Sequence, residues 1–298
     1  MAPPFGSSAL MAPAIGFDPF EPFAYAFFQR GMVVAVLAGA LCGLVGVYVV
    51  LRSMSYVGHG LSHAVFGGAA MSAALGASYF LGAGVWGVIT ALLIARVAGR
   101  GVIGSDAAIG VVTTASFAIG LVIQSRSRSL GRSLDAVLFG NVLGVRTTDV
   151  AVMVVLGVCV TVFVVAYRRE LTFATFDREV AAISGVDVRR LDALLMVAIA
   201  TTVIVSARVI GALLITAMLV LPAATLRLVV NSMRSMLVWS PALGAVCGFV
   251  GMYVSWYADV PSGAAITLVG TAVFAVAFAF SDAARRRSLA RLEQPHVV

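Results

Sequence analysis

Long runs of apolar residues, separated by short polar or charged stretches, fill the chain from about residue 27 to residue 282. A helix that spans a bilayer takes about 20 mostly apolar residues, and nine of the runs reach or approach that length. We expect these helices at residues 27–51, 57–78, 81–98, 106–124, 148–167, 189–207, 209–230, 235–256 and 262–281. The pattern predicts an all-α, polytopic integral membrane protein with about nine transmembrane helices, eight or nine in all.

Both ends of the chain lack this apolar pattern. Residues 1–26 contain five prolines and no basic residue, whereas a secretory signal needs a basic stretch before its apolar run. We therefore expect a loose N-terminal tail at 1–26, a transmembrane domain at 27–282 and a polar C-terminal tail at 283–298.

The composition excludes most soluble classes of protein. Of the 298 residues, 61% are hydrophobic and 11% are charged, against about 45–50% and 25% in ordinary soluble domains. Too little polar surface remains to cover a soluble fold, so we expect neither a soluble enzyme nor a nucleic-acid-binding protein. The chain has no lysine, which excludes the nucleotide-binding loop Gly-x-x-x-x-Gly-Lys-Ser/Thr and with it an ATPase of that type.

All twenty basic residues are arginine, and the formal net charge is +7. The arginines lie between the apolar runs, so membrane topology explains them better than a nucleic-acid partner does. With the N-terminus outside and nine spans, fourteen arginines fall on the inner face and six on the outer face. Because basic residues concentrate on the cytoplasmic side, this distribution predicts an outer N-terminus and a cytoplasmic C-terminal tail.

Glycines four residues apart lie in several of the apolar runs, and small residues at this spacing let membrane helices approach closely. The pairs are Gly39 with Gly43, Gly140 with Gly144, and Gly244 with Gly248. Each pair predicts a helix-packing face.

Two of the three histidines, His59 and His63, lie four residues apart near the start of a predicted membrane helix. Residues at this spacing share one helix face, and neutral imidazoles are good ligands for transition metals. Polar side chains are costly at this depth, so they are candidates for a functional site. Contact with a metal ion is one interpretation, and hydrogen bonding to neighbouring helices is the other.

The segment at 176–187 lies in the longest predicted inner loop and places Val180, Ile183 and Val186 among charged residues at helical spacing. Gly185 can adopt the positive φ that ends a short helix. The pattern indicates a short helix outside the membrane, either available for docking a partner or simply solvated.

Pro222 interrupts a further apolar run. A proline removes one backbone hydrogen bond and kinks or ends its helix, and the freed carbonyls near Leu219 are candidates to line a pathway. A kink that serves only helix packing explains Pro222 equally well.

In their order along the chain, these segments resemble the permease subunits of the ABC-type zinc and manganese uptake transporters. The similarity extends over about residues 30–282 and combines many short motifs rather than one. These are Arg52-x-Met54, His63-Ala-Val-x-Gly67, Asp106-Ala-Ala-Ile-Gly110, Leu138-Phe-Gly-Asn-Val-Leu-Gly144, Phe176-Asp-x-Glu-x-Ala-x-x-x-Gly185, Gly211-Ala-Leu-Leu214, Leu221-Pro-Ala-Ala-Thr225 and Asp259-x-Pro-Ser-Gly263.

The resemblance implies a transporter subunit of the bacterial cell membrane rather than an enzyme. It implies a homodimer of permeases, separate cytoplasmic ATP-binding subunits and an extracellular metal-binding lipoprotein that delivers the ion. It implies no permanently bound cofactor, with Zn²⁺ or Mn²⁺ as the transported ion. Segment 176–187 then corresponds to the coupling helix that docks on the ATPase, with Asp177, Glu179, Ala181 and Gly185 at the matching positions, and His63 corresponds to a metal-contacting residue.

One position departs from the family pattern. The family usually has an aspartate four residues before the histidine, where this chain has His59. A carboxylate suits harder ions such as manganese and an imidazole suits zinc better, so His59 favours zinc. A permease for a metal chelate such as haem or a siderophore, and a membrane scaffold or receptor that transports nothing, are the alternative functions.

Overall fold

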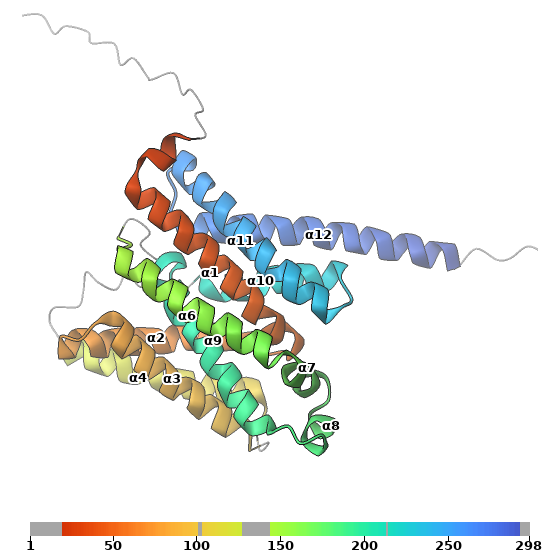
Figure 1. Cartoon of the computed structure of the whole chain (residues 1–298), viewed down its shortest axis with the longest axis horizontal. Coiled ribbons are helices and arrows are strands. Elements are labelled where there is room, and N and C mark those ends of the chain that lie inside the picture. The colour runs from red at the N-terminus through yellow and green to blue at the C-terminus, as the bar shows by residue number, and fades with distance from the viewer. Residues whose placement is uncertain (1–19, 101–102, 127–143, 213, 293–298) are drawn as a thin grey trace, which may run out of the picture.

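The computed structural model describes residues 20–100, 103–126, 144–212 and 214–292, and within these residues every regular element is a helix (Figure 1). The elements are η1 (Glu21–Ala24), α1 (Ala26–Leu51), α2 (Tyr56–Leu75), α3 (Tyr79–Ala98), α4 (Ser105–Arg126), α6 (Thr147–Ala166), α7 (Arg168–Phe176), α8 (Arg178–Ile183), α9 (Val188–Ile210), α10 (Ile215–Val229), α11 (Met233–Ala258) and α12 (Ser262–Leu292).

Each of the nine predicted membrane segments coincides with one of these helices. Seven of the described helices are long and apolar enough to cross a membrane, namely α1, α3, α4, α6, α9, α11 and α12. Two of the predicted spans, α2 and α10, are not among these seven helices. α10 is apolar but has only 15 residues. α2 is the helix that carries the two histidines. The predicted all-α polytopic membrane fold is confirmed, and among the described residues seven helices meet the length and composition of a span.

Two helices form the centre of the bundle. In α1, 72% of the most apolar window is buried inside the protein, and in α9 the share is 67%, whereas it is 33% or less in α4, α6 and α12. α6 leaves Val155, Val158, Val162 and Val165 exposed on its outer face. A helix that exposes a continuous valine face is stable in lipid and not in water, so the outer helices form the lipid-facing layer.

α1 crosses α11 in very close contact, as Figure 1 shows, and glycines make this approach possible. A Cβ placed on Gly39 would lie 2.1 Å from the carbonyl oxygen of Gly244, and one on Gly244 would lie 2.0 Å from the carbonyl oxygen of Gly39. In the same way, Gly43 lies against the backbone of Ser240, and Gly248 lies against the backbone of Ala35. The glycine pairs of 39/43 and 244/248 therefore form packing faces, as predicted, and they pack against each other. The third predicted pair includes Gly140, which lies outside the described residues.

Substituting Gly244 with valine should destabilise this contact, because the new side chain meets a backbone carbonyl that cannot move independently. The overpacking cost is about 1–3 kcal/mol or more, and we expect a lower thermal unfolding temperature of the purified protein. The control is Gly84→Val in α3, where a Cβ finds no atom within 4 Å. Equal unfolding temperatures for the two variants would contradict the close packing of α1 on α11.

Aromatic side chains gather where α1 begins and α11 ends. Trp256 lies 5.4 Å from Tyr25 and 5.3 Å from Phe28, measured between ring centroids, and Phe23 lies 5.6 Å from Phe28. Aromatic rings concentrate at the boundary between membrane and water, so this cluster marks that boundary at one end of the bundle.

Helices extend into both stretches that the sequence predicts as tails. Residues 21–24, assigned from the sequence to the loose tail, form the 3-10 helix η1, and Pro22 in it is buried. The reason is that the aromatic cluster packs this stretch against α1 and α11. At the other end, α12 continues to Leu292 and projects beyond the other helices (Figure 1). Residues 1–19 and 293–298, and the motif at 138–143, lie outside the described residues.

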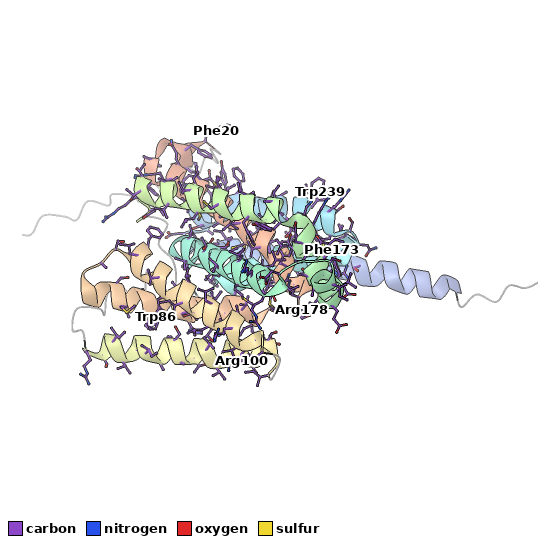
Figure 2. The ribbon with its side chains drawn as sticks, turned by 60° about the horizontal axis from the view of Figure 1, so that its bottom comes forward. Phe20, Trp86, Arg100, Phe173, Arg178 and Trp239 are labelled. Carbon is purple, nitrogen blue, oxygen red and sulfur yellow. The ribbon has the colours of Figure 1, made fainter. Side chains whose placement is uncertain are left out.

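The opposite end of the bundle is rich in arginine. It comprises α7 and α8, the start of α9 and the ends of α1 and α3, and Figure 2 shows Arg100 and Arg178 together at this end. The arginines described there are Arg52, Arg96, Arg100, Arg168, Arg169, Arg178, Arg189 and Arg190. We call it the arginine-rich end; by the positive-inside rule we expect it to be the cytoplasmic end.

Candidate functional site

His59 and His63 lie on the first two turns of α2, near the arginine-rich end. Their spacing brings the rings together, with 3.1 Å between the two Nε2 atoms and 4.5 Å between the ring centroids. At 3.1 Å one neutral imidazole donates its N–H to the other. His59 is exposed and His63 is half-buried against Phe117, whose ring centroid lies 4.8 Å away.

The histidine pair opens on a cavity of about 300 Å³ between α2 and α4. α2 lines it with Tyr56, His59, Gly60 and His63, and α4 lines it with Asp106, Ile109, Gly110, Thr113, Thr114 and Phe117. The α4 residues recur every three or four positions, which is the signature of one helix face. Asp106, which stands in one of the family-like motifs, joins the site through this face of α4, and its spacing from Ile109 and Thr113 is the sequence signal for that role.

The Nε2 atoms of His59 and His63 lie 3.1 Å apart, so both can serve as ligands of one metal ion. With metal–nitrogen bonds of about 2.1 Å, the two bonds meet at about 95°. Within the described residues, no group of three or more histidine, cysteine or acidic side chains lies close enough to hold a metal ion. One copy of the chain therefore supplies two adjacent donors and leaves the remaining ligands to water or to another molecule.

The predicted short helix outside the bundle corresponds to α8 at Arg178–Ile183. Asp177 begins it, because its side-chain carboxylate accepts hydrogen bonds from the backbone N–H groups of Glu179 and Val180 at 3.1 and 2.9 Å. Gly185 ends it with a φ of 86°, a conformation that side-chain-bearing residues adopt only with strain. Two of the predicted positions thus fix the beginning and end of α8.

The two other predicted positions in this segment face opposite ways. Ala181 is fully buried and Glu179 is exposed. Ala181 therefore anchors α8 on the bundle and does not face a partner. The exposed face instead carries Phe176, Val180 and Ile183, and 87% of Ile183 is accessible. Such apolar exposure outside the lipid-facing layer is typical of an interaction surface.

An ion-pair network that the sequence analysis missed ties α8 to the bundle. Arg52, in the short turn between α1 and α2, donates to a carboxylate oxygen of Asp192 in α9 at 2.6 Å, and Arg178 of α8 pairs with the other oxygen. Arg52 also donates to the hydroxyl of Thr175 in α7 at 3.0 Å. The network connects α7, α8 and α9 to the turn between α1 and α2, the helix that carries the histidines.

Pro222 lies inside α10 and is buried. The carbonyl oxygen of Leu219 lies against Gly46 of α1, where an added Cβ would be 2.0 Å away. In this arrangement the carbonyl serves the packing of α10 on α1.

The match to a known family covers nearly the whole transmembrane region. Residues 24–281 match the family described as the ABC 3 transport family. The chain belongs to the ABC 3 transport family. As a member, it is a permease subunit of an ABC transporter and not an enzyme, and ATP is hydrolysed by a separate ATPase subunit. The resemblance inferred from the sequence motifs is confirmed.

Relatives in this family are similar over almost their full length. The chain is 38% identical to "Manganese transport system membrane protein MntC" of Halalkalibacterium halodurans over 86% of this chain and 88% of the relative. It is 32% identical to "Manganese import system permease protein ScaB" of Streptococcus gordonii, over 85% and 90%. A solved structure, "PsaBC from Streptococcus pneumoniae in complex with Fab", matches with a TM-score of 0.78 and 32% identity, over 88% and 95% of the two chains.

Proposed function

We propose that the chain forms the membrane pathway of an importer of divalent transition metal ions, with manganese as its cargo, and that His59 and His63 contact the ion in passage. The observation that carries the proposal is the pair of Nε2 atoms 3.1 Å apart on an open cavity. Two relatives with high coverage bear names that specify manganese, which supports this cargo over a haem or siderophore chelate.

The donor geometry also supports manganese. Two imidazole nitrogens 3.1 Å apart can occupy adjacent ligand positions of an octahedral ion, the geometry that manganese prefers. Asp106 lines the same cavity, and its negatively charged carboxylate attracts a cation towards the two imidazoles. Transport also requires binding weak enough to allow release, and an incomplete set of ligands meets that requirement.

Zinc is the second candidate cargo, and His59 is the observation that favours it. An imidazole is a better ligand for zinc than for manganese, and the related permeases are expected to carry an aspartate at this position. At position 59, zinc is therefore favoured by a histidine and manganese by an aspartate.

The functional assembly is proposed to contain two copies of the chain around one pathway. A single copy offers two imidazoles, and the exposed ring of His59 is available to an ion shared with a second copy. Facing pairs would supply up to four imidazoles. Cytoplasmic ATP-binding subunits dock on α8 in this proposal, and an extracellular metal-binding lipoprotein delivers the ion at the opposite end.

The cargo is tested by metal competition with the complete transporter in vesicles. We expect wild-type protein to take up manganese, and His59→Asp to keep uptake while shifting its preference further from zinc towards manganese, because a carboxylate is the harder ligand. The measurement is uptake of each metal from a mixture of both. An unchanged ratio in His59→Asp would contradict contact between residue 59 and the ion, and wild-type uptake of zinc alone would assign zinc as the cargo.

A further inference from the structure

The seam between α3 and α9 contains a basic cavity that is separate from the histidine cavity. Its volume is about 360 Å³, and it lies at the arginine-rich end. Its lining combines three arginines with small and apolar residues: Leu92, Ala95, Arg96, Gly99 and Arg100 of the α3 end, and Arg189 and Ala193 of α9. The histidine cavity is lined by α2 and α4 and shares none of these residues.

No described acidic side chain forms an ion pair with the arginines of this cavity. In the described part of the chain, the ion pairs of Asp192 go to Arg52 and Arg178, and that of Asp187 goes to Arg190. Arg96, Arg100 and Arg189 form no ion pair with any described residue. Three arginines that line one cavity suit a phosphate group, because each guanidinium can donate two parallel hydrogen bonds to its oxygens.

A second, apolar groove lies farther along α3 and α9 and shares no lining residue with the arginine cavity. It has a volume of about 460 Å³, and its lining comes from α3, α6 and α9: Phe80, Leu81, Gly84, Val85, Val88, Ile89, Leu156, Thr201 and Ile204. One face of α3 carries, in order, Leu81, Val85, Ile89, Leu92 and Arg96, and its four apolar members are exposed; Arg100 follows just after the end of the helix. From Arg96 to Val85 the helix rises about 16 Å, close to the depth of one bilayer leaflet of about 15 Å.

We propose that this seam binds an anionic phospholipid of the cytoplasmic leaflet. The phosphate lies among Arg96, Arg100 and Arg189, and one acyl chain follows the groove beside Val85 and Ile89. Basic pockets between membrane helices on the cytoplasmic side suit lipid head groups in this way. The bound lipid fixes the end of α3 against the start of α9, directly after the α8 element.

The alignment of the arginine cavity and the apolar groove along the same two helices argues for lipid over a protein partner. An acidic surface on the ATPase would engage the arginines, yet it would not reach an apolar groove that extends a leaflet deep. A second copy of the chain meeting this seam about a two-fold axis would bring the same arginines towards each other. Both alternatives predict a result different from that of lipid in the experiment below.

The experiment measures anionic lipid retained by the complete transporter purified from vesicles of phosphatidylcholine and phosphatidylglycerol. Lipid extraction and mass spectrometry should find phosphatidylglycerol enriched over the vesicle composition. The variant R96Q/R100Q/R189Q should lose about tenfold or more of this enrichment. The matched control R168Q/R169Q/R227Q removes the same charge from exposed positions outside the cavity and should retain the enrichment within about twofold. A second variant, Gly84→Trp, fills the groove where a Cβ has no neighbour within 4 Å, and it should lower retention with the arginines intact.

Several outcomes would overturn the proposal. Equal losses in the cavity variant and the control variant would indicate only a general charge effect. Displacement of the lipid by inorganic phosphate, with Gly84→Trp having no effect, would assign the arginines to a free anion. Loss of the ATPase subunit or of the dimer from R96Q/R100Q/R189Q, with lipid retention unchanged, would make the seam a protein interface.

Discussion

Replacing His63 with alanine is expected to abolish metal uptake while leaving the amount of permease in the membrane unchanged. The half-buried ring of His63 holds one of two Nε2 atoms that lie 3.1 Å apart at the cavity. Removing a residue that only hydrogen-bonds to a metal ligand typically lowers metal affinity or activity by about 10–100-fold. Removing a ligand itself should lower uptake by at least as much. The measurement is initial uptake by vesicles that contain equal amounts of assembled transporter.

The control for this variant is Thr114→Ala, which changes the same cavity from α4 without removing a nitrogen donor. It should retain uptake close to that of the wild type. Full uptake by the double variant His59→Ala/His63→Ala would disprove the role of the pair. A loss of protein from the membrane, instead of a loss of transport, would assign the pair to helix packing.

Much of the fold follows from short-range features of the sequence. Apolar length alone placed helices at all nine predicted positions, because a bilayer demands long apolar helices whatever their neighbours are. The glycine pairs at 39/43 and 244/248 indicated packing faces, but not that they meet each other. That pairing depends on how α1 and α11 cross, and residues two hundred positions apart carry no local signal for it.

The same division applies to the candidate site. The four-residue spacing of His59 and His63 requires only one helix, so the pair was predictable. Asp106 joins the cavity from α4, and Asp192 joins Arg52 to Arg178 across three segments. Both depend on tertiary packing. Ala181 illustrates the limit of a motif, because its position matches the coupling element while its burial gives it an anchoring role.

The element α8 is well placed to transmit movement from the ATPase to the histidine helix. Its exposed apolar face is available to a partner, and the pairing of Arg178 with Asp192 and of Asp192 with Arg52 connects it to the turn before α2. Alternating access requires such a rigid contact, because closure of the ATPases has to move helices that open to each side in turn. The path from α8 to His59 is short, since α2 begins four residues after Arg52.

We therefore expect Gly185→Val to leave the permease inserted and bound to its ATPase, with ATP hydrolysis continuing and metal uptake lost. Gly185 has a φ of 86° and no atom within 4 Å of an added Cβ, so the substitution acts through the backbone at the end of α8. Strain of this kind costs about 1–3 kcal/mol and is relieved most easily by unwinding a six-residue helix.

Gly76→Val is the matched control: Gly76 has a φ of 66° and equally open surroundings, but it ends α2 far from α8. Glu179→Arg, which reverses an exposed charge on α8 itself, should reproduce the uncoupling. The ratio of metal transported to ATP hydrolysed measures the effect, and a normal ratio in both α8 variants would remove α8 from the coupling pathway.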